Sequence, residues 1–254
     1  MNMSEQLENR RYFLKDFIRQ QTDFSNTGQA RQQPPPPLQK ACSADIVRVN
    51  LPDGANALER LAQISLAKAL LDRESVRKYT QEPLNLEQIT ALLWATQGVR
   101  GVLSPACALR TVPSAGARHA FETYLAVNRV DELPSGLYRY LPFNNQLAQL
   151  RLDANIGRKA ADACLRQNFV ADAAVTFFWT TIPARMEWRY GMAAHKVIAI
   201  DVGHVCQNLY LACTALHAGT CAIAAYDQAA CDRLLDVDGK EEFTIYIAPI
   251  GKIQ

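Results

Sequence analysis

The sequence predicts an α+β fold whose sheet is largely antiparallel. Runs that alternate like strands are joined by short turn sequences, most clearly in the hairpin pattern of GLYRYLPFNNQLAQL. Single helical segments are interspersed among these strands, and the longest, at residues 185–217, is apolar on nearly every side. A helix of this kind is buried on several sides or is shared across a dimer interface.

Residues 1–64 differ in composition from the rest of the 254-residue chain. They include QARQQPPPPLQK, whose four prolines favour an extended, polyproline-like path. We expect an N-terminal extension, an arm draped over a domain or a partner subunit, followed by one domain at residues 65–254. The stretch NRRYFLKDF looks like a twin-arginine export signal, but polar residues follow it where such a signal needs apolar ones. We therefore expect a cytoplasmic protein.

Two helix signals open the predicted domain. Ser65 can cap a short helix over LAKALLD, and Asn85 with Gln88 forms a capping-box pattern before LEQITALLWATQ, which Gly98 can end. The remaining elements follow in chain order. They are a strand in FETYLAV, the hairpin bent at Asn144 and Asn145, a polar helix over residues 153–167, a central strand in AAVTFFWTTI, the long helix, a buried strand in TCAIAAYD, a short helix in QAACDRLLDV and a closing strand in EFTIYIAPIG.

Composition argues against several classes of function. The formal net charge is +2, so nothing indicates nucleic acid or an anionic membrane as a partner. No window approaches the roughly 18 consecutive apolar residues of a membrane span. The seven cysteines include no CxxC pair and are expected to be free thiols. HExxH and similar ligand spacings do not occur, so we expect no metal.

The run RESVR is a candidate phosphate-binding segment. If it is extended, Arg73, Ser75 and Arg77 point to the same side. Two guanidinium groups with a hydroxyl between them suit a phosphate, which accepts bidentate, charge-assisted hydrogen bonds. The alternative is a solvated charged turn whose arginines pair with acids such as Asp72 and Glu74.

The loop RTVPSAGARHAF, residues 110–121, directly precedes a predicted strand. It lacks the GxSxG elbow of a serine hydrolase, and nothing in the sequence ties Ser114 to a base such as His119. It also lacks the glycines and the GK[ST] of a phosphate-binding loop. Two interpretations stay open. Pro113 can fix the backbone while Gly116 lets main-chain groups approach a planar ligand, or the loop is a plain strand-entry turn.

The long helix carries polar side chains within its apolar pattern. His204, Gln207 and Asn208 share a face, at three- and four-residue spacings. These side chains can contact a ligand, or the two amides can be hydrogen-bonded core groups.

In chain order, these motifs resemble the nitroreductase superfamily. The matching runs are RESVRKYTQEPL, PSAGARHAFETYLAV, GLYRY, DVGHVCQNLYLA, AIAAYD, LLDVDG and IYIAPIGK, and they cover residues 65–252 in consistent order. The resemblance is strongest to the SagB/thiazole-oxazole oxidase-like dehydrogenase branch (SagB/ThcOx-type), which often carries an N-terminal extension. It implies a nitroreductase-like fold, with a largely antiparallel sheet flanked by helices around a long buried helix. It also implies an FMN-dependent enzyme that forms an intertwined homodimer with two active sites at the subunit interface.

The same resemblance implies roles for particular residues. The FMN-binding set is Arg73, Ser75 and Arg77 for the phosphate and ribityl chain, Pro113, Ser114, Ala115 and Gly116 approaching the flavin from the other subunit, Ala224 and Ala225 near the reactive edge of the ring, and Lys252 near the phosphate. A backbone N–H at that edge can bond N5 and stabilise charge that develops on the reduced flavin. Positive charge at the N1–O2 edge would come from Arg73 or Arg118. The candidate proton donors are Tyr190, His195 and His204.

The chain departs from the family pattern at several positions. The family loop usually reads PSAGN or PSSxN, and the asparagine position is Ala117 here. The loop at the reactive edge usually has glycine where Ala225 stands. Azoline-oxidising members use a Lys-Tyr pair in the helix region, where this chain has roughly AAHK, with His195 and Lys196.

The resemblance predicts an oxidoreductase that transfers hydride between a donor such as NAD(P)H and a small organic acceptor through flavin N5, in ping-pong order. A first alternative is a dehydrogenase of azoline or peptide-derived substrates in modified-peptide biosynthesis. A second alternative is a flavin-binding module without turnover, which Ala117 favours.

Overall fold

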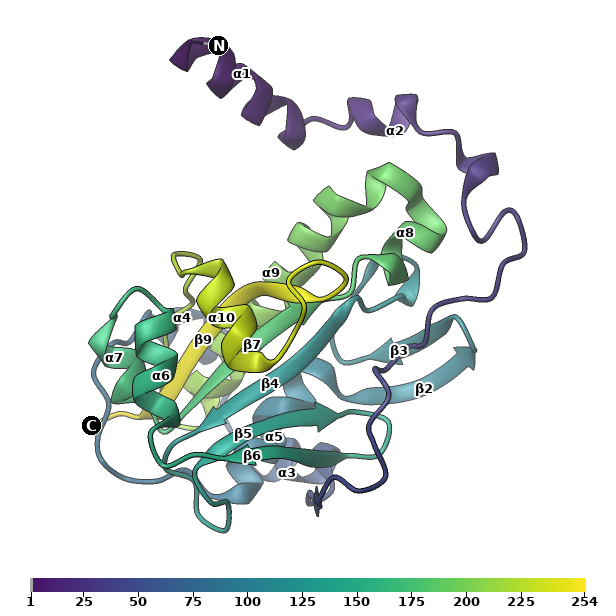
Figure 1. Ribbon diagram of the computed structural model, residues 1–254. Coiled ribbons are helices and arrows are strands. Elements are labelled where there is room, and N and C mark those ends of the chain that lie inside the picture. Colours follow the sequence, from purple (N-terminus) through teal and green to yellow (C-terminus); the bar gives the residue numbers. More distant parts are fainter. Residues whose placement is uncertain (1) are drawn as a thin grey trace.

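The computed structural model describes residues 2–254, and within them seven strands form one sheet. The strands are β1 (Arg48–Asn50), β4 (Phe121–Val127), β5 (Gly136–Leu141), β6 (Gln146–Leu152), β7 (Val175–Thr181), β8 (Ala218–Thr220) and β9 (Phe243–Lys252). Their order across the sheet is β1-β6-β5-β4-β7-β9-β8, and every neighbouring pair is antiparallel. A separate hairpin joins β2 (Val99–Ser104) to β3 (Cys107–Arg110) (Figure 1). The prediction of an α+β fold with a largely antiparallel sheet is confirmed.

Helices cover both faces of this sheet (Figure 1). The helices of the first face are α3 (Gly54–Leu61), α4 (Leu66–Asp72), α5 (Leu86–Gln97), α8 (Ala184–Tyr190) and α9 (Ala194–Ala215), and those of the second face are α6 (Ile156–Ala163), α7 (Asn168–Ala171) and α10 (Gln228–Leu235). Leu125 and Val127 of β4 belong to the core under α5 and α9, whereas Tyr124 and Ala126 belong to the core under α6 and α10. This alternation is the one a strand imposes. All residues of β4 and β7 are buried, which explains the continuous apolar run that predicted β7.

The predicted cap signals are present at both early helices. The Ser65 hydroxyl accepts a hydrogen bond from the Lys68 N–H at 3.1 Å, at the start of α4. At the start of α5, Asn85 accepts from the Gln88 N–H at 2.8 Å, and the Gln88 side chain accepts from the Asn85 N–H at 3.1 Å. The predicted hairpin is β5 and β6, and Asn145 in its turn takes a left-handed φ of 49°. These local predictions are confirmed.

The continuous helix predicted over residues 185–217 is wrong. The structure divides it into α8 and α9 at Gly191, which takes φ 51° and ψ −136°. Glycine adopts such angles because it has no Cβ, and they end a helix. The side chain of Thr22, from the N-terminal extension, lies close to this turn. Apolar residues on both sides of Gly191 concealed the break in the sequence pattern.

The buried strand predicted for TCAIAAYD is also wrong. The strand in this region is β8, which ends at Thr220, and among residues 221–227 the structure gives a bridge for Ile223 alone, to Ile247 of β9. The backbone N–H of Ala222 donates instead to the hydroxyl of Tyr210, at 2.8 Å. A side chain of α9 therefore takes the hydrogen bond that a sheet neighbour would have made, and the chain continues as a loop.

Two further segments differ from the prediction. The polar helix expected at residues 153–167 ends early, as α6, because Leu165 and Arg166 take left-handed φ angles of 56° and 61°. The hairpin of β2 and β3 was not predicted. Its outer side chains, Val102 and Leu103, are apolar and exposed, so its sequence lacks the usual alternation of buried apolar and exposed polar residues.

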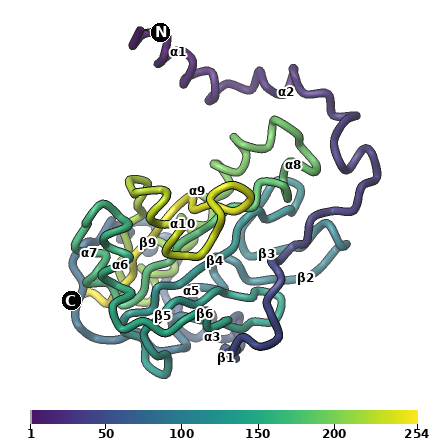
Figure 2. The backbone as a smooth tube through the Cα atoms, viewed as in Figure 1, coloured from purple at the N-terminus to yellow at the C-terminus, as the bar shows by residue number. Residues whose placement is uncertain are grey.

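The start of the chain stands off the domain. None of the residues described in α1 (Met3–Leu14) or α2 (Phe17–Gln21) is buried, and both helices extend away from the sheet (Figures 1 and 2). The chain then runs past the β2–β3 hairpin to β1, which pairs with β6 at the sheet edge. Packing on the domain therefore begins before residue 65. The division into residues 1–64 and 65–254 stays a prediction.

The proline-rich segment lies against the domain of its own chain. Three buried arginines donate to its backbone carbonyls, and a buried carboxylate accepts one of its amides. These bonds join Arg185 to Pro37 (2.8 Å), Arg110 to Leu38 (3.1 Å), Arg139 to Ala41 (2.7 Å) and the Lys40 N–H to Glu122 (2.8 Å). Hydrogen bonds to charged groups of this kind contribute about 1.5–3 kcal/mol each. They fix the segment in register on the sheet.

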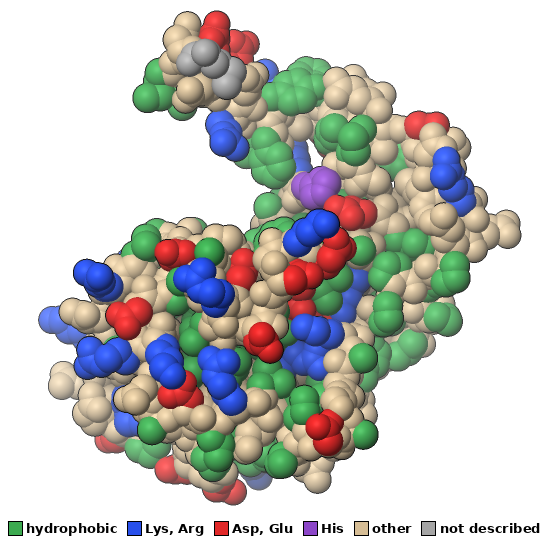
Figure 3. All heavy atoms as spheres, viewed as in Figure 1, with side chains coloured by type: hydrophobic (Ala, Val, Ile, Leu, Met, Phe, Trp, Pro, Cys, Tyr) green, Lys and Arg blue, Asp and Glu red, His purple; other side chains and the backbone are tan. Residues whose placement is uncertain are grey.

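The core helix α9 has 22 residues, which corresponds to a length of roughly 33 Å. By length and hydropathy the segment Ala184–Ala215 could cross a membrane, but 44% of its most apolar window is buried within the fold. It is the core helix of this domain, and no membrane localisation is indicated. Basic and acidic side chains are interspersed over the face of the molecule in Figure 3.

Candidate active site

Two of the residues predicted to bind phosphate meet a tyrosine of α9. The Ser75 hydroxyl lies 3.0 Å from the Tyr210 hydroxyl, and the Arg73 guanidinium carbon lies 5.5 Å from the centre of the Tyr210 ring. The same Tyr210 hydroxyl accepts the hydrogen bond from Ala222. Arg73, Ser75, Tyr210 and Ala222 form what we call the Tyr210 cluster. It connects RESVR to the loop at residues 221–227.

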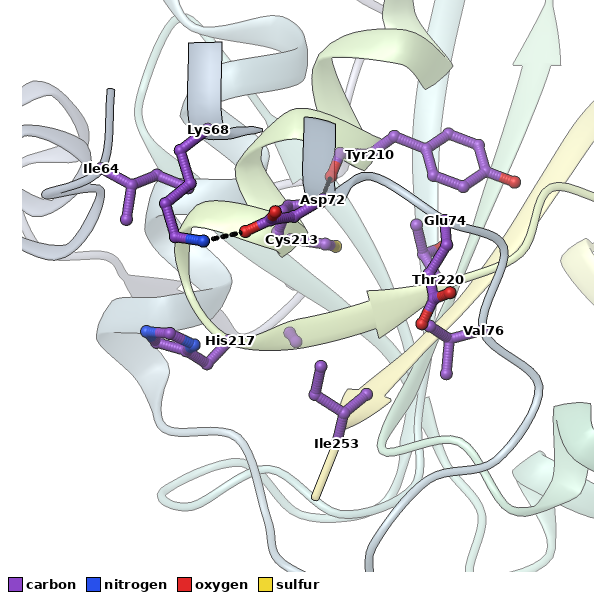
Figure 4. A pocket seen from close by; sticks show the side chains of 12 residues that line it. Ile64, Lys68, Asp72, Glu74, Val76, Tyr210, Cys213, His217, Thr220 and Ile253 are labelled. Carbon is purple, nitrogen blue, oxygen red and sulfur yellow. Dashed lines mark hydrogen bonds and ion pairs between the residues drawn. The ribbon is translucent and has the colours of Figure 1, made fainter. Parts of the chain in front are cut away.

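The backbone of RESVR explains this arrangement. The Val76 N–H donates to the carbonyl of Thr220 at 2.9 Å, so the segment runs extended beside β8. Arg73 and Ser75 contact Tyr210, and Glu74 and Val76 line a cavity of about 160 Å³ that Tyr210 and His217 also line (Figure 4). Arg73 and Ser75 therefore share a neighbour, as expected for alternate residues of an extended RESVR. The cavity is smaller than the roughly 300–1,000 Å³ of typical small-molecule sites.

Arg77 and Lys252 lie at the open edge of this region. The Arg77 side chain is exposed and forms no ion pair with any residue at 2–254. Lys252 ends β9, accepts the Thr80 N–H at its carbonyl, and forms an exposed ion pair with Glu82 at 3.3 Å. Of the two expected acidic partners, Asp72 pairs with Lys68 instead, at 2.5 Å. The structure therefore does not use Asp72 to neutralise the arginines of RESVR.

Ala224 and Ala225 lie in the loop that Tyr210 anchors. Both are exposed, and within residues 2–254 neither backbone N–H has a hydrogen-bond partner. The carbonyl of Ala225 accepts from the Gln167 side chain at 2.9 Å, which fixes the far side of the loop. Two amide donors are thus available to a ligand beside the Tyr210 cluster.

The loop at residues 113–116 is held by a different part of α9. The buried carboxylate of Asp201 accepts the Ala115 N–H at 3.1 Å and also bonds the Ser114 side chain. Burial raises the pKa of Asp201, and these two hydrogen bonds oppose that rise. The Ser114 hydroxyl also accepts the His119 N–H at 3.0 Å. We call Ser114, Ala115 and Asp201 the Asp201 cluster.

Gly116 and Ala117 form the tight part of this loop, with left-handed φ angles of 61° and 53°. A Cβ on Gly116 would lie 2.7 Å from the Tyr190 hydroxyl. The side chains of Tyr190 and Arg189 in α8 therefore lie close to Gly116. The Ala117 N–H donates to the Ser114 carbonyl at 2.9 Å and closes the turn. Pro113 is exposed beside it.

The buried side chains that follow the loop are occupied internally. Nε2 of His119 lies 2.9 Å from the carbonyl of Ala108, and burial lowers the pKa of His119 to about 3. Arg118 donates to the carbonyls of Arg185 and Ala106, and its guanidinium stacks on the Trp188 ring. His119 is therefore not a base for Ser114, and Arg118 is enclosed within the fold.

The other candidate proton donors lie near the Asp201 end of α9. His204 is exposed one turn after Asp201 and interacts with its carboxylate electrostatically. His195 forms an exposed pair with Glu187 at 2.8 Å across the Gly191 break. The structure thus gathers Tyr190 and His204 around the loop at residues 113–116 and pairs His195 elsewhere. Asn208 donates to the Ala95 carbonyl of α5 at 2.9 Å, so it is a hydrogen-bonded core amide.

The Tyr210 cluster and the Asp201 cluster are separate within one chain. Tyr210 is nine residues beyond Asp201 on α9, which corresponds to roughly 14 Å along the helix axis. All seven cysteines are free, and no group of three or more His, Cys, Asp or Glu side chains within residues 2–254 is suited to a metal ion. The two clusters therefore lie at different levels of one helix.

Comparison with known proteins identifies the family. The model of the nitroreductase family matches residues 70–252. A Methanocaldococcus jannaschii protein named as a nitroreductase is 31% identical over 208 residues, which are 82% of this chain and 98% of the relative. The chain therefore belongs to the nitroreductase family.

Solved structures agree with this assignment at the level of the fold. A Ralstonia eutropha protein described as a nitroreductase has a TM-score of 0.67 at 24% identity, over 87% of this chain and 99% of its own. The Escherichia coli microcin synthetase McbBCD complex, solved with truncated pro-MccB17, contains a chain with a TM-score of 0.59 at 15% identity, over 96% of this chain and 92% of its own. The NADPH:FMN oxidoreductase of Vibrio harveyi, solved with NAD⁺, gives 0.51 at 16% identity, over 73% of this chain and 67% of its own.

Sequence reasoning missed Tyr210 and Asp201 as site residues. Both stand in the run DVGHVCQNLYLA, in which the histidine and the two amides are the residues that share a helical face. The spacing of nine residues places the two on different turns, so no single helical face connects them. Their common feature is that each hydrogen-bonds the backbone of a distant loop, and a helical pattern alone does not reveal such partners.

Proposed function

We propose that this chain is an FMN-dependent oxidoreductase of the nitroreductase family. It would transfer hydride between a donor such as NAD(P)H and a small organic acceptor. The observation that carries the proposal is the Tyr210 cluster. It joins a segment that holds half-buried Arg73 and exposed, unpaired Arg77 to a loop with two free backbone N–H groups. The first suits a phosphate and the second suits an acceptor atom of a planar ring.

The charges and hydrogen-bond donors of these residues suit FMN. Arg73, Ser75 and Arg77 would hold the phosphate end, with Lys252 at the same edge. Ala224 and Ala225 would offer their N–H groups to the reactive edge of the ring. When bound, FMN supplies the two-electron chemistry through N5. The protein binds and orients the reactants, and donor and acceptor use the same pocket in turn.

The proposed active unit is a homodimer. Within one chain the loop at residues 113–116 is held roughly 14 Å along α9 from the Tyr210 cluster, and we propose that a second copy brings the two to one ring. Apolar side chains are exposed next to these two regions, as a subunit interface requires. They include Leu66 and Leu71 of α4, Leu103 of β2 and Ile200 of α9. We place the protein in the cytoplasm.

Three side chains could deliver the proton to the second substrate: Tyr190, His195 and His204. Tyr190 contacts Gly116, and His204 lies beside Asp201, so both are close to the loop that would face the ring. His195 is engaged by Glu187 at 2.8 Å. We therefore rank Tyr190 and His204 ahead of His195 as proton donors to the second substrate.

FMN titration of the purified chain tests the binding site. Arg73→Ala and Arg77→Ala should each weaken FMN binding roughly ten- to hundredfold, since each removes a charge-assisted contact of about 1.5–3 kcal/mol. Arg158→Ala is the matched control, because this exposed arginine is on α6, on the opposite face of the sheet. Equal affinity in all three variants would identify RESVR as a solvated turn. A wild-type protein that takes up no FMN would refute the cofactor assignment.

Anaerobic reduction separates the candidate reactions. Bleaching of the bound flavin by NAD(P)H supports the proposed oxidoreductase. The likeness to a chain of the microcin synthetase complex favours a second candidate, a dehydrogenase of azoline or peptide-derived substrates of the SagB/ThcOx type. Bleaching by a thiazoline or oxazoline peptide, and not by NAD(P)H, supports that candidate. A flavin that no donor bleaches indicates a binding module without turnover.

A further inference from the structure

The Tyr210 hydroxyl is the one group that contacts both parts of the proposed FMN site in the described chain. It lies 3.0 Å from the Ser75 hydroxyl and 2.8 Å from the Ala222 nitrogen. The ring beneath it lies against the Arg73 guanidinium, 5.5 Å from its carbon. A tyrosine hydroxyl can accept one hydrogen bond and donate another, so both contacts can be satisfied at once.

Ala222 marks the point at which the chain leaves the sheet. Thr220 is still paired in β8, and Ala224 and Ala225 are exposed with free N–H groups. The hydrogen bond from Ala222 to Tyr210 comes two residues before these free amides. Ile223, between Ala222 and these amides, is held to Ile247 of β9 by two backbone hydrogen bonds, at 2.8 and 3.3 Å, and the Ala225 carbonyl accepts from Gln167 at 2.9 Å. The bond from Ala222 is the contact that ties this stretch to α9 and, through Tyr210, to Ser75 of the phosphate-binding segment.

We propose that Tyr210 is a positioning residue that sets the register between the phosphate-binding segment and the loop at the reactive edge of the flavin. This inference rests on the proposed function. Its consequence is specific. Loss of the hydroxyl should change how the site distinguishes oxidised from reduced FMN, because the loop faces the atoms whose protonation differs between the two forms.

The test is Tyr210→Phe in the full-length protein, which keeps the ring against Arg73 and removes only the hydroxyl. We expect the affinity for oxidised FMN to fall about five- to tenfold, the size of one lost neutral hydrogen bond. We expect the ratio of affinities for oxidised and reduced FMN to change at least threefold, a shift in midpoint potential of about 14 mV for a two-electron couple. The measurements are FMN titration and anaerobic redox titration.

Tyr138→Phe is the matched control. Its hydroxyl donates to the Pro134 carbonyl at 2.7 Å within the sheet region, away from the Tyr210 cluster. It should lower stability without moving the potential of the bound flavin. A double-mutant cycle with Ser75→Ala adds a second readout: coupling between Ser75 and Tyr210 in FMN affinity is expected, and additivity would contradict the proposal.

The results for the wild type and for Tyr210→Phe test the cofactor site and the role of Tyr210 separately. If the wild type binds FMN and Tyr210→Phe has the same affinity and potential, Tyr210 has no positioning role and the proposed cofactor site stands. The same conclusion follows if Tyr210→Phe weakens oxidised and reduced FMN equally, since that is the effect of a purely structural loss. If the wild type binds no FMN, the proposed function itself fails.

Discussion

The buried histidine below the loop at residues 113–116 should make this protein sensitive to mild acid. His119 is buried, its ring nitrogen faces the carbonyl of Ala108, and the guanidinium groups of Arg110, Arg118 and Arg185 surround it. Burial, followed by Arg110, lowers its pKa to about 3. A folded molecule therefore keeps this imidazole neutral at every pH above that value.

The sign and size of the effect follow from proton linkage. An unfolded histidine has a pKa of about 6.5, so the unfolded chain binds more protons than the folded one between pH 6.5 and about 3. The contribution of the neutral His119 to the free energy of unfolding is fully present above pH 6.5 and is lost as the pH falls from 6.5 towards 3. At pH 5 the loss is roughly 2 kcal/mol. For a chain of this size that corresponds to a decrease in Tm of about 4–8 °C.

The assay compares urea unfolding at pH 7.5 and pH 5 for the wild type and His119→Gln. Glutamine can donate to the Ala108 carbonyl and does not titrate, so any packing cost appears equally at both pH values. His204→Gln, at an exposed position of α9, is the control for replacing a histidine by glutamine. The wild type and the control should lose about 2 kcal/mol more than His119→Gln between the two pH values. Equal losses in all three proteins would refute the reasoning.

Two further predictions concern the buried ion network and the tight loop. Glu122→Gln removes the carboxylate that pairs with buried Arg185 at 2.5 Å, and should lower the free energy of unfolding in urea by about 3–5 kcal/mol. Lys68→Ala breaks the exposed pair with Asp72 and should lower it by at most about 1 kcal/mol. Similar losses in the two variants would contradict the burial of the Glu122 pair. Gly116→Ala should lower the free energy of unfolding by about 1–2 kcal/mol, because the φ of Gly116 is 61° and a Cβ there would contact the Tyr190 hydroxyl. An unchanged urea midpoint would show that the loop adopts another conformation.

Local signals predicted the regular parts of this fold well. The capping box at Asn85 and the apolar run of β7 each depend on residues close together in sequence, so their outcome is fixed locally. The break at Gly191 comes where that glycine takes φ 51° within an apolar pattern, and the loop after Thr220 depends on contacts from elsewhere, such as the one with the Tyr210 hydroxyl. Propensity cannot reveal such contacts, because they are tertiary.

The candidate site shows the same limit. The alternation of an extended RESVR was predictable, and Arg73 and Ser75 do share a neighbour. The sequence also drew attention to the loop at residues 113–116, as either a clamp on a planar ligand or a plain strand-entry turn. In the structure Tyr190 occupies the space at Gly116, and Asp201 holds Ser114 and Ala115. The sequence pattern identified these segments, but the contacts of their side chains can be seen only in the folded structure.

The spacing of the two clusters along α9 has a geometric consequence for the proposed dimer. A twofold axis makes every contact reciprocal, so an antiparallel pair of α9 helices would bring the Asp201 end of one copy beside the Tyr210 end of the other. Of the residues between these positions, Gly203 and His204 are exposed, whereas Val205 and Cys206 at the midpoint are buried. A Cβ added to Gly203 would meet no atom within 4 Å, so the helix is open there to a close approach by a second helix. In such a dimer each subunit would supply the loop at residues 113–116 to its partner's Tyr210 cluster, and neither site would be complete without both.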